Sequence, residues 1–262
     1  MLLAIDIGNS NVTFGLAEGG KWKHTWRLPT MGDGEALLYY EVQITNYLLE
    51  KDVAAGEVKR VVVSTVVPAL RSIFEGLVFH LFRIQPIVVG PDIYPRLRLQ
   101  IARPDELGTD LYANAVAAHY LFRQDCIITD FGTALTFTTV NSAGELLGVS
   151  IAPGLKTAIS SLFQKTAQLP EVPLELPASA VGKNTVHAIQ SGILIGYVGL
   201  VRHMLQAIRA ELGQQYIAVA TGGLSSILHP LEDEFYAIEP NLTLDGLRLI
   251  GEEVGKGSGT EP

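Results

Sequence analysis

Two short segments of the chain each place an acid at the end of an apolar stretch and a glycine two residues later. The first segment covers residues 6–11 and the second covers residues 130–134. Glycine lets backbone N–H groups approach a ligand closely, and a carboxylate at such a turn can hold a cation or its water. Each segment alone is also typical of an ordinary turn. Together they indicate two hairpins that hold a phosphate ligand from opposite sides.

A common spacing relates the two segments. Three pairs of identical residues stand 124 positions apart, namely Asp6 and Asp130, Gly8 and Gly132, and Gly20 and Gly144. Both Gly20 and Gly144 follow a second apolar stretch, where a hairpin turn is expected. The repeated spacing predicts that the chain contains two similar halves.

A third segment, Thr221, Gly222 and Gly223, follows directly after an apolar stretch at residues 216–220. A backbone without side chains lets a flat ring lie close to it, so this segment could hold adenosine. A Gly-Gly pair at such a place is also typical of a simple turn. Its position after both hairpins favours the nucleotide interpretation.

The elements that must position these segments follow an α/β pattern. Short apolar stretches rich in β-branched residues alternate with helical periodicity. We expect strands at residues 2–5, 12–16, 22–26, 60–64, 86–90 and 216–221. We expect helices at residues 35–50, after Pro68, at residues 104–123, from Pro153, at residues 184–212 and after Leu244. The expected domains are residues 1–123 and 124–257, followed by a tail at residues 258–262.

The composition is that of an acidic globular protein. Hydrophobic residues make up 48% of the chain, and the formal net charge is −8 with a pI near 5.2. This charge disfavours nucleic acid and anionic membrane surfaces as partners. The single cysteine, Cys126, cannot form an internal disulfide, and the first residues include neither a basic segment nor a long apolar one. We therefore expect a cytoplasmic protein.

The six histidines do not have the spacing of a metal site. They are His24, His80, His119, His187, His203 and His229. The apolar segment 194–200, with Gly192, Gly196 and Gly199, indicates a closely packed helix. In an acidic chain we interpret this helix as a buried interface rather than as a membrane span.

The three glycine-containing segments resemble the phosphate 1, phosphate 2 and adenosine motifs of the superfamily that includes actin and sugar kinases. Further segments narrow the resemblance to the type III pantothenate kinases: residues 104–110 (PDELGTD), residues 148–154 (GVSIAPG), residues 182–185 (GKNT) and residues 190–192 (QSG). The match extends from Leu3 to about Gly251.

This resemblance implies an α/β fold of duplicated ribonuclease H-like domains, the actin-like ATPase fold, each a mixed sheet flanked by helices. It implies that the chain phosphorylates pantothenate with ATP and Mg²⁺ to 4'-phosphopantothenate, the first step of coenzyme A biosynthesis. It also implies a homodimer.

The resemblance assigns roles to individual residues as well. The ATP-binding residues are Asp6, Ile7, Gly8, Asn9, Ser10, Asn11, Val12, Thr13, Thr133, Gly222 and Gly223. The substrate-binding residues are Gly108, Thr109, Asp110, Leu111 and Thr185. Thr185 acts across a dimer interface in the family, although beside Asn184 it could also belong to a helix N-cap.

Two acids have special roles in this resemblance. Asp110 occupies the position of the general base, and Asp130 that of a ligand for a monovalent cation, K⁺ or NH₄⁺. The helix dipole is expected to keep Asp110 ionised so that it can accept a hydroxyl proton, although an acid at a helix start commonly only caps. Asp130 could instead hold Mg²⁺ or its water.

The sequence departs from the family on the substrate side. The family usually has Gly-Ala-Asp-Arg where this chain has Gly108, Thr109, Asp110 and Leu111, so a guanidinium is missing. Ile101 stands where an aromatic residue is common. Two alternatives therefore stay open: a nucleotide-binding regulatory homologue without catalysis, and a kinase of the same fold for another small hydroxylated substrate. The presence of Asp110 favours catalysis.

Overall fold

The computed structural model describes residues 1–97, 99–165, 172–223 and 229–256. The chain forms two compact units, unit 1 with residues 1–117 and 242–262, and unit 2 with residues 118–241. The C-terminal helix, which begins at residue 242, therefore belongs to the same compact unit as the N-terminal half. The division into domains 1–123 and 124–257 stays a prediction, and the expected tail at residues 258–262 lies outside the described residues.

Unit 1 is built on a five-stranded mixed sheet with the order β3-β2-β1-β4-β5. Its strands are β1 (Leu2–Ile7), β2 (Asn11–Glu18), β3 (Lys21–Pro29), β4 (Arg60–Thr65) and β5 (Ile87–Val88). Strand β1 pairs antiparallel with β2 and parallel with β4. The helices are α1 (Asp33–Glu50), α2 (Pro68–Phe82) and α7 (Leu242–Lys256), with short elements η1 (Ala55–Glu57), η2 (Tyr94–Arg96), β6 (Gln100–Ile101) and η3 (Pro104–Glu106).

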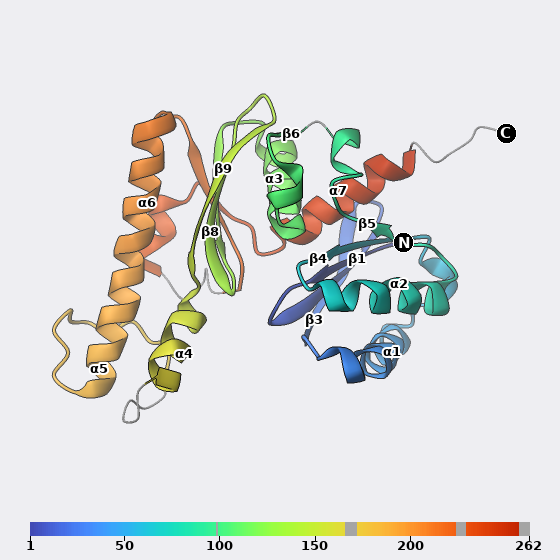
Figure 1. Cartoon of the computed structure of the whole chain (residues 1–262), viewed down its shortest axis with the longest axis horizontal. Helices are drawn as coiled ribbons and strands as arrows, with labels where there is room; N and C mark the ends of the chain where they lie inside the picture. Colours follow the sequence, from blue (N-terminus) through green and yellow to red (C-terminus); the bar gives the residue numbers. More distant parts are fainter. Residues whose placement is uncertain (98, 166–171, 224–228, 257–262) are drawn as a thin grey trace. The chain divides into compact units, whose positions relative to one another are not determined.

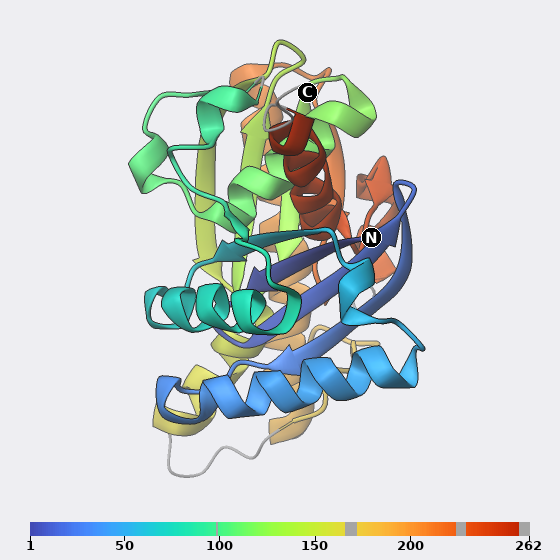
Figure 2. The same cartoon turned by 90° about the vertical axis from the view of Figure 1, so that its right-hand side faces the viewer.

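Successive side chains of β1 point to opposite faces of the sheet of unit 1, and helices cover both faces. Leu3, Ile5 and Ile7 enter a core that includes buried residues of α1 and α2. Helix α7 packs on β1, β2 and β4, and Figure 1 shows it on the face of this sheet opposite α1 and α2. Figure 2 shows α1 and α2 side by side.

Unit 2 repeats this topology. Its strands are β7 (Cys126–Phe131), β8 (Ala134–Val140), β9 (Glu145–Pro153), β10 (Ile217–Thr221) and β11 (Ala237–Ile238), in the order β11-β10-β7-β8-β9. Each strand thus occupies the place of its counterpart in unit 1. Strands β7 and β9 also begin and end 124 positions after β1 and β3. The predicted duplication is confirmed.

Helices α4 (Leu155–Lys165) and α6 (Gly196–Leu212) contribute to the core of unit 2. Helix α6 continues α5 (Thr185–Gln190) through a π-helical turn, η4 (Ser191–Ile195), and η6 (His229–Glu234) follows later in the chain. Among the described residues, Thr185–Leu212 is long and apolar enough to cross a membrane, with a mean hydropathy of 1.2. This is weak evidence, because a core helix passes the same test, and here Leu194, Val198 and Val201 are buried in the core.

Two predicted elements differ from those observed. The helix expected at residues 104–123 is the turn η3 followed by α3 (Thr109–Phe122), because Leu107 has an extended backbone that interrupts the helix. The strand expected at residues 86–90 is reduced to Ile87–Val88, which pairs with β4 at the edge of the sheet.

Candidate active site

The β1–β2 hairpin exposes the polar residues of the first predicted phosphate motif. Asn9, Ser10 and Asn11 are exposed, whereas Ile7 and Val12 are fully buried and can offer a ligand only their backbone. The hairpin is closed by a hydrogen bond of 3.0 Å from the Gly8 N–H to the carbonyl oxygen of Asn11. Its tip is therefore fixed by backbone contacts while its polar side chains remain accessible.

Asp6 lies at the end of β1, half-buried beside β4. The parallel register pairs Asp6 with Ser64, whose hydroxyl donates to Asp6 Oδ1 at 3.0 Å. Ser64 Oγ also lies 2.9 Å from Oγ1 of Thr109, the first residue of α3. Sequence reasoning did not single out Ser64. The sequence signal that could have identified Ser64 is its position, since it is a polar residue directly after the apolar residues 61–63.

Asp110 is the second residue of α3 and is half-buried. Its Oδ1 accepts a hydrogen bond of 2.8 Å from the Leu111 N–H. Gly108 leaves room for this carboxylate, since a Cβ atom at residue 108 would lie 2.6 Å from Asp110 Oδ1. The buried rings of Tyr94 and Tyr112 stack with centroids 3.8 Å apart in the same unit.

Burial decides the electrostatics of Asp110. It raises the pKa of this carboxyl, and hydrogen bonds from the backbone N–H groups of Leu111 and Asp110 lower it only in part. The helix dipole alone was expected to favour the charged form, so burial opposes that expectation. Burial and, second, the charge of Asp110 raise the pKa of Tyr94 to about 12. A carboxylate with a raised pKa is better matched to accepting a proton near neutral pH.

The second acid and the adenosine motif lie together in unit 2. Strand β7 ends near Asp130, and the parallel register with β10 places Thr221 beside it. Gly222 follows with a φ of +92°, and a Cβ atom there would lie 2.6 Å from Asp130 Oδ1. Only glycine suits this conformation and this space. Thr133, in the turn between β7 and β8, is exposed. Gly223, which directly follows Gly222, is exposed as well.

The start of α4 contacts the turn of the β7–β8 hairpin, which carries the second predicted phosphate motif. The Gly154 N–H donates to the carbonyl oxygen of Thr133 at 3.0 Å, and the Thr157 hydroxyl donates to the same oxygen at 2.7 Å. A Cβ atom on Gly154 would collide with the backbone of Gly132 and Thr133. Gly154 belongs to a motif quoted above but was not among the predicted contacts, and no sequence signal pointed to Thr157.

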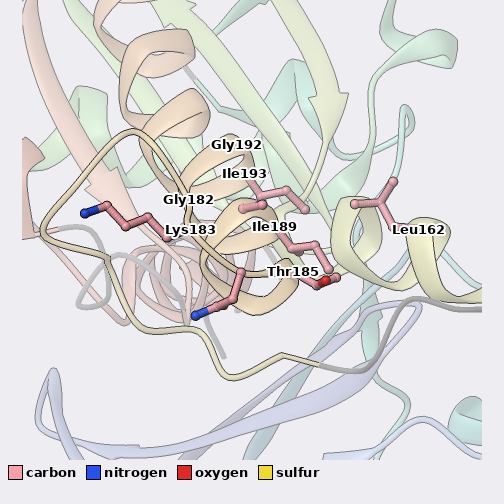
Figure 3. Close-up of a pocket in the computed structure, with 9 residues that line it drawn as sticks. Leu162, Gly182, Lys183, Thr185, Ile189, Gly192 and Ile193 are labelled. Atoms are coloured by element: carbon pink, nitrogen blue, oxygen red, sulfur yellow. The ribbon is translucent and has the colours of Figure 1, made fainter.

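Thr185 lies at a pocket of about 700 Å³ within unit 2. Leu162 of α4 faces the helix that carries Thr185, Ile189 and Ile193, while the side chain of Lys183 points away (Figure 3). The pocket is also lined by Gly182, Asn184, Ala188 and Gly192. Asn184 is the N-cap of α5, since its side chain accepts the His187 N–H at 2.9 Å.

The two positions that depart from the family have different surroundings. Leu111 is only 9% exposed at the start of α3, whereas Ile101 is half-buried in the short strand β6. Within the described residues, no group of three or more His, Cys, Asp and Glu side chains could hold a metal ion.

Comparison with known proteins adds the deciding observation: the family model of type III pantothenate kinases matches residues 2–207. The chain belongs to this family. The type III pantothenate kinase of Dehalococcoides mccartyi strain CBDB1 is 41% identical over 249 residues, which cover 95% of this chain and 94% of that protein. The type III pantothenate kinase of Geobacter sulfurreducens is 38% identical over 252 residues, which cover 96% and 98%.

A solved structure extends the likeness of this type III pantothenate kinase to the fold. The activator of the 2-hydroxyisocaproyl-CoA dehydratase from Clostridium difficile, with bound ADPNP, is similar with a TM-score of 0.55. It is 11% identical, and the match covers 100% of this chain and 99% of that chain. The fold is the actin-like ATPase fold, as the resemblance implied, and the family's reaction is the ATP-dependent phosphorylation of pantothenate in coenzyme A biosynthesis.

Proposed function

We propose that Asp110 is the general base with which this type III pantothenate kinase transfers a phosphoryl group from ATP to pantothenate. The primary hydroxyl gives its proton to the Asp110 carboxylate, its oxygen bonds to the γ-phosphorus, and ADP leaves with the bridging oxygen. The observation that carries this assignment is the half-buried carboxylate with a raised pKa at the start of α3. Most of the remaining catalysis is positioning and charge neutralisation.

We assign ATP binding to both hairpins and to the turn after β10. The exposed side chains of Asn9, Ser10 and Asn11 donate to phosphate oxygens, and Thr133 is exposed for the same task. Gly222 and Gly223 offer a bare backbone to the adenosine. Mg²⁺ bound to the ATP phosphates would neutralise part of their charge.

Asp130 suits a monovalent cation better than a small divalent one. Its carboxylate would repel the phosphates of ATP unless a cation were bound between them. K⁺ and NH₄⁺ hold their water weakly, so one carboxylate together with backbone carbonyl oxygens can replace it. The backbone at Gly222 approaches the Asp130 carboxylate closely, since a Cβ atom on Gly222 would lie 2.6 Å from Asp130 Oδ1. Mg²⁺ holds its water strongly and demands octahedral geometry.

We expect the activity to rise with K⁺. The measurement is a titration of KCl against choline chloride at fixed Mg²⁺ and ionic strength, in the wild type and in Asp130→Ala. The wild type should be activated by K⁺, and Asp130→Ala should lose that response because the carboxylate ligand is gone. Equal wild-type activity in both salts would assign Asp130 to Mg²⁺ or its water instead.

Substrate recognition falls to Gly108, Thr109, Asp110, Leu111 and Thr185 in this proposal. Leu111 lacks the guanidinium that the family pattern usually has, so pantothenate would be held with one charged contact fewer. A substrate panel tests the proposal. Turnover of pantothenate supports it, turnover of another hydroxylated acid alone would indicate a changed acceptor, and ATP binding without any transfer would indicate a regulatory homologue.

We also propose a cytoplasmic homodimer with the long helix in its interface. Gly192, Gly196 and Gly199 are exposed, and a Cβ atom on any of them would meet nothing within 4 Å. Close approach of a second copy fits such a face, and two-fold dimers are the commonest homo-oligomers. Sedimentation at micromolar concentration should give a dimer, and Gly196→Arg should shift it towards monomer. A wild-type monomer would leave Thr185 without its role across the interface.

A further inference from the structure

Three side chains form a hydrogen-bonded chain from the end of β1 to the start of α3. Ser64 Oγ donates to Asp6 Oδ1 at 3.0 Å and lies 2.9 Å from Thr109 Oγ1. The Thr109 hydroxyl also donates to the carbonyl oxygen of Thr65 at 3.2 Å. Ser64 is fully buried, and Asp6 and Thr109 are half-buried. Water therefore competes weakly for these hydrogen bonds.

The number of protons limits how these hydroxyls can bond. A hydroxyl has one proton and an ionised carboxylate only accepts, so the proton of Ser64 is used for Asp6. The Thr109 hydroxyl donates to the carbonyl oxygen of Thr65 and also lies within hydrogen-bond distance of Ser64 Oγ, where either hydroxyl can be the donor. Thr109 is therefore tied to β4 through Thr65 and to Asp6 through Ser64.

We propose that Thr109 is a positioning residue that couples the carboxylate of Asp6 to the placement of Asp110. Thr109 directly precedes Asp110, and its hydroxyl holds the first turn of α3 on the ends of β1 and β4. A change of ligand at Asp6 alters how strongly it accepts from Ser64, and this change reaches α3 through Thr109. The inference rests on the proposed roles of Asp6 in ATP binding and of Asp110 as the base.

The test compares Thr109→Val with Thr109→Ser. Valine keeps the branched shape without the hydroxyl, so kcat should fall about three- to tenfold, the share of one hydrogen bond. The KM for pantothenate should change less. Serine keeps the hydroxyl and should restore most of the lost kcat. Because Ser64→Ala removes one of the two contacts of the Thr109 hydroxyl, Thr109→Val should cost less kcat in the Ser64→Ala background than in the wild type.

A matched control removes a hydroxyl from a different contact of α3. Thr243 Oγ1 donates to Asn114 Oδ1 at 2.8 Å, so Thr243→Val should lower Tm without the loss of kcat. The inference is overturned if Thr109→Val keeps wild-type kcat, if serine fails to restore it, or if the Ser64 and Thr109 effects add. Pantothenate turnover by the wild type reports on the proposed function alone, so the two can fail separately.

Discussion

Asp110→Asn is expected to reduce phosphoryl transfer to pantothenate by about 10²- to 10⁴-fold, the usual contribution of a general base. The amide keeps the size of the carboxyl but cannot accept the proton of the attacking hydroxyl. ATP should still bind, because the assigned ATP contacts lie on other residues. The measurement is kcat from steady-state turnover, combined with the Kd of ATP from calorimetry on the same protein.

The pH profile of the wild type is the matched readout for this variant. Burial raises the pKa of Asp110, so the proton-accepting form is present above that pKa and activity falls as the pH is lowered through it. This acidic limb should lie above the pH at which an exposed aspartate titrates, and Asp110→Asn should lack it. Near wild-type turnover would restrict Asp110 to capping, a role that its hydrogen bond from the Leu111 N–H already permits.

Gly154→Ala is expected to disrupt the second phosphate hairpin. The added methyl group would collide with backbone atoms of Gly132 and Thr133, which cannot move as a flexible side chain can. Overpacking of this kind typically costs about 1–3 kcal/mol of stability. We expect Tm to fall by several degrees and kcat to fall about tenfold or more, because the hydrogen bond to the Thr133 carbonyl is displaced at the same time.

Gly148→Ala is the control for that experiment. Gly148 lies on β9, the strand that leads to Gly154, but a Cβ atom there meets nothing within 4 Å. Its stability and kcat should stay close to those of the wild type. Equal behaviour of the two alanine variants would show that the close approach at Gly154 does not support the hairpin.

The repeat was predictable because it rests on local signals. Apolar strands, acids at their ends and turn glycines recur at one spacing, and five strands of one sheet follow the same order as their counterparts in the other. The second hairpin is one residue shorter, since Ile7 pairs with Val12 but Phe131 pairs with Leu135. The common spacing of the acids and glycines could not predict this difference in loop length.

Contacts between distant parts of the chain were harder to predict. The partnership of Asp6 with Ser64 depends on the parallel register of β1 and β4, which no local pattern fixes. Gly222 was predicted to approach adenosine, but its closeness to Asp130 comes from the pairing of β10 with β7. The direction of the pKa shift of Asp110 depends on burial, which the helix start alone did not indicate.

The most direct test of the central claim is to identify the product. Wild-type protein and Asp110→Asn are incubated with ATP, Mg²⁺, K⁺ and pantothenate, and 4'-phosphopantothenate is quantified by mass spectrometry beside ADP. We predict one phosphopantothenate for each ADP with the wild type, and a yield lower by about 10²- to 10⁴-fold with the variant. ADP release without phosphopantothenate, or equal yields from both proteins, would contradict the account.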